Sequence, residues 1–198
     1  MQSPVSLSSF WNRLSVAGID MRLDHNITPR LTRGGTDAST RSGRALWMGT
    51  VSVNRQRAGD VQAVRGVVDA LNARIPFLMR LPRSRDDAGT ITAASGKAIT
   101  IEGLTAGGTI GVGTILSYQT SGGVYMAHSV VFGGTRTVTD GVAVLELSSE
   151  VAPSGVVGRA CTFTPVIAAY LDGDGRIPFD PARSAPWSFN FVQTLEAF

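Results

Sequence analysis

The stretch Ala45-Leu-Trp-Met-Gly-Thr-Val-Ser-Val53 alternates between apolar and polar side chains. This period of two is typical of a strand with one buried face, because successive side chains of a strand point to opposite sides. The buried side would carry Trp47, Val51 and Val53. Near the other end of the sequence, Trp187-Ser-Phe-Asn-Phe191 alternates in the same way. We expect these two strands to pair, so that the residues between Leu81 and Trp187 form an insertion in one sheet-containing domain.

A helix is predicted after the first strand, because apolar residues follow Asp60, the expected N-cap, at helical spacing. Its buried face would carry Val61, Val64, Val68 and Leu71, and its outward face Gln62, Arg65, Asp69 and Asn72. We expect Pro76 to end the helix, since the residue before a proline leaves the α region. The apolar run 77–81 then predicts a second strand, and Val16–Asp24 predicts an earlier one.

Short β-type runs separated by glycine fill the middle of the chain. They are residues 98–101, 114–119, 123–131, 142–147 and 159–167. Strands at this spacing predict a small barrel, closed or nearly closed, and polar connectors (82–89 and 171–186) bracket it. The predicted fold is therefore mainly β with one helix. It consists of a discontinuous β-domain of residues 1–87 and 171–198 and an inserted barrel of residues 88–170.

The composition favours short strands joined by tight turns, since 43% of the residues are hydrophobic and 23 are glycine. The net charge is +3, and residues 1–87 carry 13 arginines against 7 aspartates. These arginines would suit an acidic partner, but no compact basic run marks a site, so a solvated surface is the simpler interpretation. A single cysteine, Cys161, excludes a disulfide within the chain and favours a reducing compartment. Residues 1–14 lack the signal-peptide pattern and no apolar run is long enough for a membrane span, so we expect neither.

No catalytic constellation is visible in the sequence. There are 2 histidines, His25 and His128, and no Gly-x-Ser-x-Gly motif. Cys161 with His128 is the one nucleophile–base pair to consider, and a buried, inert Cys161 is the simpler interpretation. These residues also cannot assemble the usual ligand set of zinc. We therefore predict a protein that is not an enzyme and that binds no metal and no cofactor.

Two glycine-containing motifs fail as ligand sites. Asp172-Gly-Asp-Gly175 is similar to the centre of a calcium loop, but Tyr170 and Pro181 stand where such a loop carries its outer carboxylates. Ser95-Gly-Lys97 is similar to the end of a phosphate-binding loop. That pattern needs a glycine where Ile91 stands and a hydroxyl residue after the lysine. Both motifs are interpreted as turns.

A small barrel often binds nucleic acid, so its charge and its aromatic residues need attention. Residues 88–168 hold 3 basic side chains against 4 acidic ones. Binding of single strands needs a positive groove with interleaved aromatic residues. We therefore expect no direct nucleic-acid recognition. Tyr118 and Tyr125 are the candidate glycan or protein contacts of the barrel, although packing in the core or in turns is the simpler interpretation of both.

Residues 27–44 form a polar segment with almost no apolar side chains, so the segment cannot build a core of its own. We interpret it as a long loop that becomes ordered on assembly. Its arginines are the candidate assembly contacts and would meet carboxylates of a partner. They are Arg30, Arg33, Arg41 and Arg44.

The order of the segments is more specific than the composition. A tryptophan-bearing strand (46–51), a helix (60–71) and an apolar strand ending at Pro82 come first. They are followed by Ile99-Thr-Ile-Glu-Gly-Leu104, Gly111-Val-Gly-Thr-Ile-Leu-Ser117, Asp140-Gly-Val-Ala-Val-Leu145 and Trp187-Ser-Phe-Asn-Phe-Val192. Over about residues 45–195 this order resembles the distal tail proteins, the baseplate or tail-tip adaptors, of long-tailed bacteriophages and related gene-transfer particles.

The resemblance implies a ring-forming, β-sandwich-like domain made from both chain ends, with an inserted OB-type small β-barrel. It implies a structural protein without catalytic residues, of which six copies close a ring between the tail tube and the baseplate hub. The partners would be other copies of the chain, the tail tube protein and the baseplate hub protein, with the tape-measure protein or tail fibres as further candidates. The protein would be made in the host bacterial cytoplasm and reside at the virion tail tip.

Two alternatives stay open beside this interpretation. One is a carbohydrate-binding accessory module of a tail or cell-surface assembly, which would use the two barrel tyrosines. The other is a small hydrolase, for which turnover would depend on His128 or Cys161.

Overall fold

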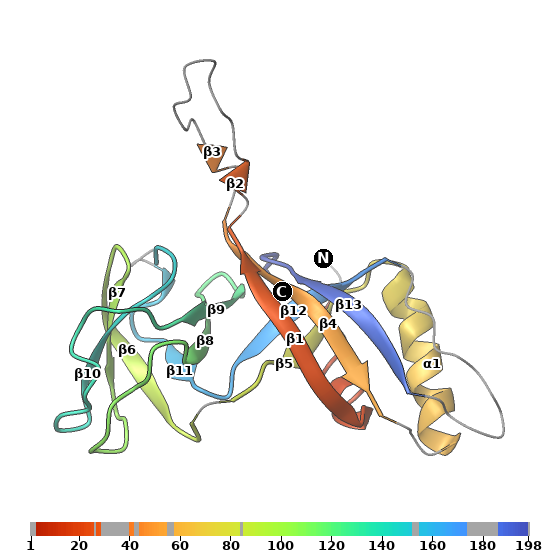
Figure 1. The fold of residues 1–198 in the computed structure, drawn as a ribbon, viewed down its shortest axis with the longest axis horizontal. Helices are drawn as coiled ribbons and strands as arrows, with labels where there is room; N and C mark the ends of the chain where they lie inside the picture. Colours follow the sequence, from red (N-terminus) through yellow and green to blue (C-terminus); the bar gives the residue numbers. More distant parts are fainter. Residues whose placement is uncertain are drawn as a thin grey trace. The chain divides into compact units, whose positions relative to one another are not determined.

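The computed structural model describes residues 3–25, 27–28, 40–41, 44–54, 58–83, 85–151, 155–173 and 186–197. Over these residues the fold is mainly β, with a single α-helix and two antiparallel sheets (Figure 1), which confirms the predicted fold class. The first sheet has the order β1 (Val16–Asp24), β4 (Leu46–Val53), β13 (Trp187–Gln193), β12 (Val166–Asp172) and β5 (Phe77–Arg80). The second has the order β10 (Ala143–Glu146), β7 (Ala98–Glu102), β6 (Ala88–Ser95), β11 (Ala160–Thr162), β8 (Ile115–Gln119) and β9 (Tyr125–Ser129). The remaining elements are the pair β2 (Ile27–Thr28) and β3 (Thr40–Arg41), the helix α1 (Ala58–Asn72) and the 3-10 turn η1 (Trp11–Arg13).

The chain divides into two compact units. The sheet unit consists of Leu14–Arg74 and Tyr170–Gln193 and holds β1, β4, β13 and α1. The barrel unit consists of Met1–Arg13, Ile75–Ala169 and Thr194–Phe198 and holds β5 and the whole second sheet. Each unit buries its own set of apolar side chains.

The sheet unit is built on the pairing of β4 with β13, as the alternation of both strands predicts. Trp187 lies opposite Val53, and Phe189 lies opposite Val51. The side chains predicted to face inward are buried on both strands, and β1 adds to the other edge of β4 over its full length. The predicted pairing of the two terminal strands is therefore confirmed, and the apolar side chains of both strands lie on one buried face.

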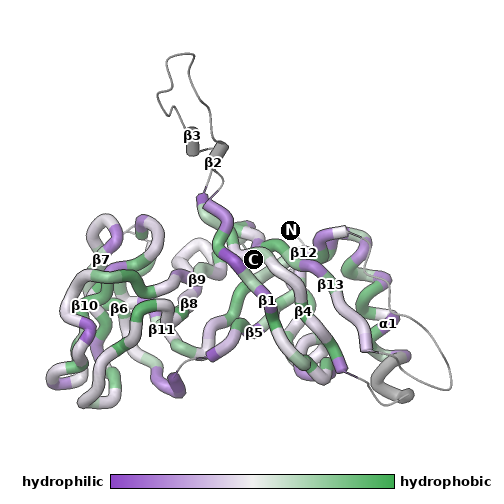
Figure 2. The backbone as a smooth tube through the Cα atoms, in the orientation of Figure 1, coloured by the Kyte–Doolittle hydropathy of each residue, from purple (hydrophilic) through white to green (hydrophobic). Residues whose placement is uncertain are grey.

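Helix α1 buries Val64, Val68 and Leu71, which confirms three members of the predicted apolar face; the side chain of Val61 lies outside the described residues. The four predicted outward residues are exposed. Along α1, the tube in Figure 2 changes between hydrophobic and hydrophilic colours, as expected for a helix with one buried face.

Both predicted ends of α1 need correction. The helix begins at Ala58, ahead of Asp60, so Asp60 is not its N-cap. Aspartate is common in the first helical turn as well as at the cap, so the residue type alone did not determine the start. At the other end the helix stops at Asn72, because Arg74 takes a positive φ of 61° and donates its N–H to the carbonyl of Leu71. The chain has therefore left the helix before Pro76.

In the barrel unit, the N-terminal segment packs against β5. Val5 forms a parallel bridge with Phe77, whose ring meets Phe10 edge to face with 5.2 Å between the ring centroids. On its other side β5 pairs with β12, from Val166 onward. Residues from Val166 therefore lie in the first sheet, although the run 159–167 was predicted as one barrel strand.

The second sheet curls so that its two edge strands approach each other. Beyond the ends of β9 and β10, Val130 forms an isolated bridge with Leu147, and the N–H of Val131 donates to the carbonyl of Glu146 at 2.8 Å. The sheet has six strands where five were predicted. The sixth is β6, whose β-branched run Thr90-Ile91-Thr92 is short and is followed by Ala93, Ala94 and Ser95, which carry little strand signal. The predicted boundaries, 1–87 with 171–198 and 88–170, stay a prediction.

Asp87 ties the entry of the barrel to the loop after β7. Its carboxylate accepts hydrogen bonds from the N–H groups of Thr105 and Ala88, and the Arg85 guanidinium lies at 2.9 Å. Burial by itself raises the pKa of Asp87. The hydrogen bonds from Thr105, Arg85 and Ala88 together outweigh burial and lower this pKa below its ordinary value.

This lowered pKa predicts a loss of stability in acid. A carboxyl group with a lower pKa in the folded state contributes stability above its unfolded pKa, and the contribution disappears as the pH falls through the folded pKa. The free energy of unfolding should therefore decrease from about pH 5 to about pH 2, and less steeply in Asp87→Asn. Urea titrations at several pH values measure this slope. Asp86→Asn, at an exposed neighbour, is the control; an equal change of slope in both variants would contradict the assignment.

Candidate functional site

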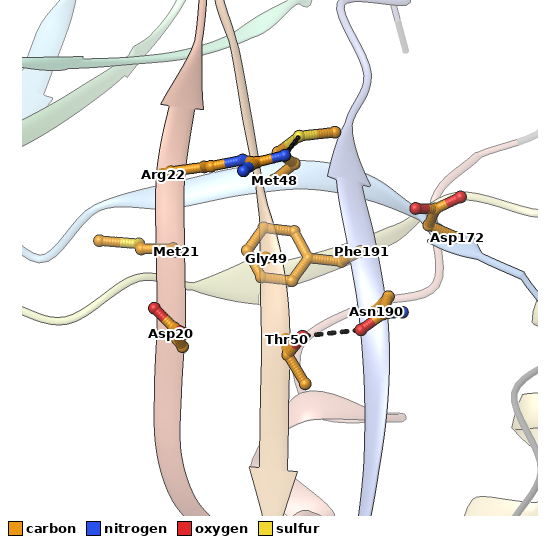
Figure 3. A pocket seen from close by; sticks show the side chains of 9 residues that line it. All are labelled: Asp20, Met21, Arg22, Met48, Gly49, Thr50, Asp172, Asn190 and Phe191. Carbon is orange, nitrogen blue, oxygen red and sulfur yellow. Dashed lines mark hydrogen bonds between the residues drawn. The ribbon is translucent and has the colours of Figure 1, made fainter.

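A shallow hollow of about 310 Å³ lies on the sheet unit, across β1, β4 and β13 (Figure 3). It lies mainly on the outer face of the three strands, where the even-numbered residues of β4 and β13 point away from the buried side. Its lining residues are Asp20, Met21, Arg22, Met48, Gly49, Thr50, Asp172, Asn190 and Phe191.

Strand register aligns the polar side chains of the hollow in a row. Asp20 and Asn190 each lie directly opposite Thr50, one on either side of β4. The Thr50 hydroxyl donates a hydrogen bond of 2.7 Å to the Asn190 side-chain oxygen. One step along the strands, Arg22 extends over Met48 and places its guanidinium 3.7 Å from the thioether sulfur (Figure 3).

Gly49 lines the hollow, and the backbone of β1 lies so close to it that no side chain fits on this residue. A Cβ on this residue would stand 2.1 Å from the carbonyl oxygen of Asp20 and 2.8 Å from the Cα of Met21. The residue that pairs with Gly49 on β13 is Phe191, which is fully buried. The absence of a Cβ thus lets β1 approach β4 closely.

The charges of the hollow are mixed. Within the described part of the chain, the side chains of Asp20, Arg22 and Asp172 form no ion pair. The same part of the chain contains no group of three or more His, Cys, Asp or Glu residues arranged for a metal ion. With an amide, a hydroxyl, a guanidinium and carboxylates but no nucleophile–base pair, the hollow is equipped to hydrogen-bond a polar partner.

A second polar group lies inside the barrel unit. His128 on β9 is 1% exposed. Its ring nitrogens lie 3.0 Å from the Tyr118 hydroxyl and 2.8 Å from the Ser149 hydroxyl. The Tyr118 and His128 rings also stack at 5.6 Å. These contacts connect β8, β9 and the segment after β10 near the seam of the curled sheet, so a structural role accounts for them.

The buried position of Tyr118 rules it out as a glycan or protein contact and agrees with the simpler interpretation, packing in the core. The side chain is 4% exposed and its hydroxyl bonds to His128, so its ring cannot stack on a glycan or a partner. Four successive residues of β8 are buried, so alternation along this strand could not separate an inward from an outward face. Tyr125, at the start of β9, is half-buried and keeps part of its ring accessible.

Cys161 is buried on β11, opposite Tyr118 on β8. Burial raises the pKa of its thiol to about 11, so the thiol is protonated at neutral pH. A protonated, buried thiol is a poor nucleophile, while both ring nitrogens of His128 already contact hydroxyl groups. These contacts favour the interpretation of Cys161 as a small apolar side chain.

The predicted assembly arginines are described only in part. Arg30 and Arg33 lie outside the described residues, and of Arg41 only the backbone, in β3, is described. Arg44 is exposed just before β4. The hollow was not predicted, although the alternation that assigned one face of β4 to the core also assigned Met48 and Thr50 to the opposite face.

No protein-family model matches the chain, and no curated protein matches it. Among the described residues, no helix is long and apolar enough to cross a membrane.

Proposed function

We propose that this protein is a structural tail-tip adaptor of a phage-like particle. Six copies would form a ring that joins the tail tube to the baseplate hub. The observation that carries the proposal is the order of elements along the chain: β4, α1 and β5, then the strands of the curled sheet, then β12 and the return of β13 to β4. This is the order on which the resemblance to distal tail proteins rests.

A polar outer face on the sheet unit supports a role in assembly. A ring of identical copies needs a head-to-tail contact in which two different surfaces of the chain meet. Interfaces of this kind commonly combine a few apolar atoms with polar and charged side chains at the rim. The hollow offers Met48 among Asp20, Arg22 and Asn190, and we assign it to one side of this contact.

The proposal is tested in the bacterium that carries the gene. Particles are induced, purified and labelled with gold-conjugated antibody against this chain, and electron microscopy should place the gold at the tail tip. The gene should also lie between genes for a tape-measure protein and a hub protein. Gold on the capsid or along the tail shaft, or the absence of any particle, would refute a tail-tip role.

Variants of the protein, expressed in a strain from which the gene has been deleted, test which surface is used in tail assembly. Arg22→Glu reverses a charge in the hollow and should leave few intact tails, whereas Arg159→Glu, an exposed change in the barrel unit, should restore them. Equal restoration by both variants would remove the hollow from the assembly. If the particles lack the protein and glycan arrays instead show binding that is lost in Tyr125→Ala, the carbohydrate-binding alternative replaces the adaptor.

A further inference from the structure

Phe132 is the most exposed large apolar side chain in the described part of the chain. It lies in the connection between β9 and β10 of the barrel unit and is 80% exposed. The other exposed large apolar residues there, Val112 and Val157, are smaller and are 42% and 51% exposed. A phenyl ring that is exposed to water contributes no free energy of burial. Contact with another apolar surface would bury the ring and supply this stabilisation.

The loop that carries Phe132 is held in place by hydrogen bonds. Thr137 bridges to Thr109, and the carbonyl of Arg136 accepts a bond of 2.9 Å from the N–H of Ile110. Next to Phe132, Gly133 has a positive φ of 126°, a conformation that residues with a side chain rarely adopt. The ring is thus presented by a defined backbone, which lowers the conformational entropy lost when a contact forms.

A positive side chain lies over the ring, and a negative one lies against the next residue of the chain, Gly133. The Arg136 guanidinium stacks over the ring at 6.0 Å from its centroid. The Glu146 carboxylate fills the place where a Cβ of Gly133 would stand, with an oxygen 1.8 Å from that position. Neither charge forms an ion pair among the described residues. The barrel knob, defined as Phe132, Arg136 and Glu146, therefore combines an apolar ring with one positive and one negative group.

We propose that the barrel knob binds the same surface of a second copy of this chain across a two-fold axis. In a two-fold contact the same surface of both copies is used. If residue i of the first copy contacts residue j of the second, then residue j of the first also contacts residue i of the second, so the surface must be complementary to itself. The knob meets this condition, because two Phe132 rings can stack at the axis while Arg136 of each copy pairs with Glu146 of the other. A surface with one sign of charge would repel its own copy.

This contact differs from the ring contact of the proposed function, which is head-to-tail and uses the sheet unit. Two stacked rings and two ion pairs make a small interface, far below the area of a stable dimer. The isolated chain should therefore associate weakly through the knob. Neighbouring copies in one six-fold ring are not related by a two-fold axis, so the knobs of an assembled ring would join it to a second ring. Several knobs acting together would then strengthen the association through effective concentration.

Disulfide trapping tests the two-fold geometry. Thr135 is exposed in the same loop, so Thr135→Cys places a thiol beside the contact and keeps the Phe132 ring and both charges. Mild oxidation of this purified full-length variant should join two copies covalently. Val157→Cys, at another exposed apolar position, should give little dimer. The natural Cys161 competes poorly, because it is buried and its pKa is raised to about 11. Equal dimer yield from both variants would overturn the proposal.

Sedimentation equilibrium at increasing protein concentration tests the charges. The natural chain should dimerise, and Phe132→Ala should weaken the dimer at least about tenfold. Arg136→Glu alone and Glu146→Arg alone should also weaken it, and the double exchange should restore it because the pairs re-form with opposite sign. A chain that stays monomeric, or failure of the double exchange to restore dimers while both single variants remain folded, would refute the two-fold contact.

Discussion

Val64→Asp should lower the free energy of unfolding by more than about 3 kcal/mol, because it places an unpaired charge in the buried face of α1. Val64 has no exposed surface, and Val68 and Leu71 on the same face are buried as well. The carboxylate would have to stay charged without a partner or take up a proton at a strongly raised pKa. Urea unfolding followed by circular dichroism measures the loss.

The control for this change lies on the same helix. Gln62 is exposed on the opposite face of α1, so Gln62→Asp introduces the same charge into water and should change stability by less than about 0.5 kcal/mol. Comparable destabilisation by the two substitutions would mean that the buried face of α1 has been misassigned.

Gly49→Ala should destabilise the sheet unit by roughly 2 to 3 kcal/mol, although it adds a single methyl group. The added Cβ would collide with the carbonyl oxygen of Asp20 and the Cα of Met21, and both atoms belong to the backbone of β1. A backbone atom in a paired strand cannot rotate away as the end of a side chain can. Relief therefore requires β1 and β4 to separate, which weakens their hydrogen bonds and distorts the hollow.

Gly18→Ala is the matched control, since Gly18 lies on the adjacent strand β1 and a Cβ there meets no atom within 4 Å. Thermal unfolding should show a clear decrease in midpoint for the variant at Gly49 and little change for the variant at Gly18. If Gly49→Ala unfolds at the same temperature as the natural chain, the close approach of β1 to β4 is not a constraint on this residue.

Sequence patterns predicted the sheet unit well, because its strands have one buried and one exposed face. The alternation around Trp47 and around Phe189 predicted which side chains face inward, and the paired strands bury those side chains. The spacing of Val64, Val68 and Leu71 likewise admitted one buried face. The spacing at which apolar residues recur is a local property of the sequence, so one sequence is enough to predict which face of a helix or strand is buried.

The barrel unit was harder to predict from local pattern. The strand β6 contains Ala93 and Ala94 beside a register shift, so its pairing with β7 depends on neighbours more than on its own residues. The run around Phe163 looked like one strand, but it divides between two sheets. Strand propensity measures fit to a pleated, half-buried surface, and that surface exists only once the sheet has formed.

The sequence by itself determined the mainly β class, the helix and its buried face, and the pairing of the two terminal strands, since each follows from the period at which apolar residues recur. Only the tertiary structure decided that Tyr118 is buried against His128, that Phe132 is exposed beneath Arg136, and that Asp20, Thr50 and Asn190 form one row. The first and the last of these arrangements bring together side chains from different strands, and the second depends on the path of one loop. Their distances depend on register and on the curl of a sheet, which the order of residues in one strand does not specify.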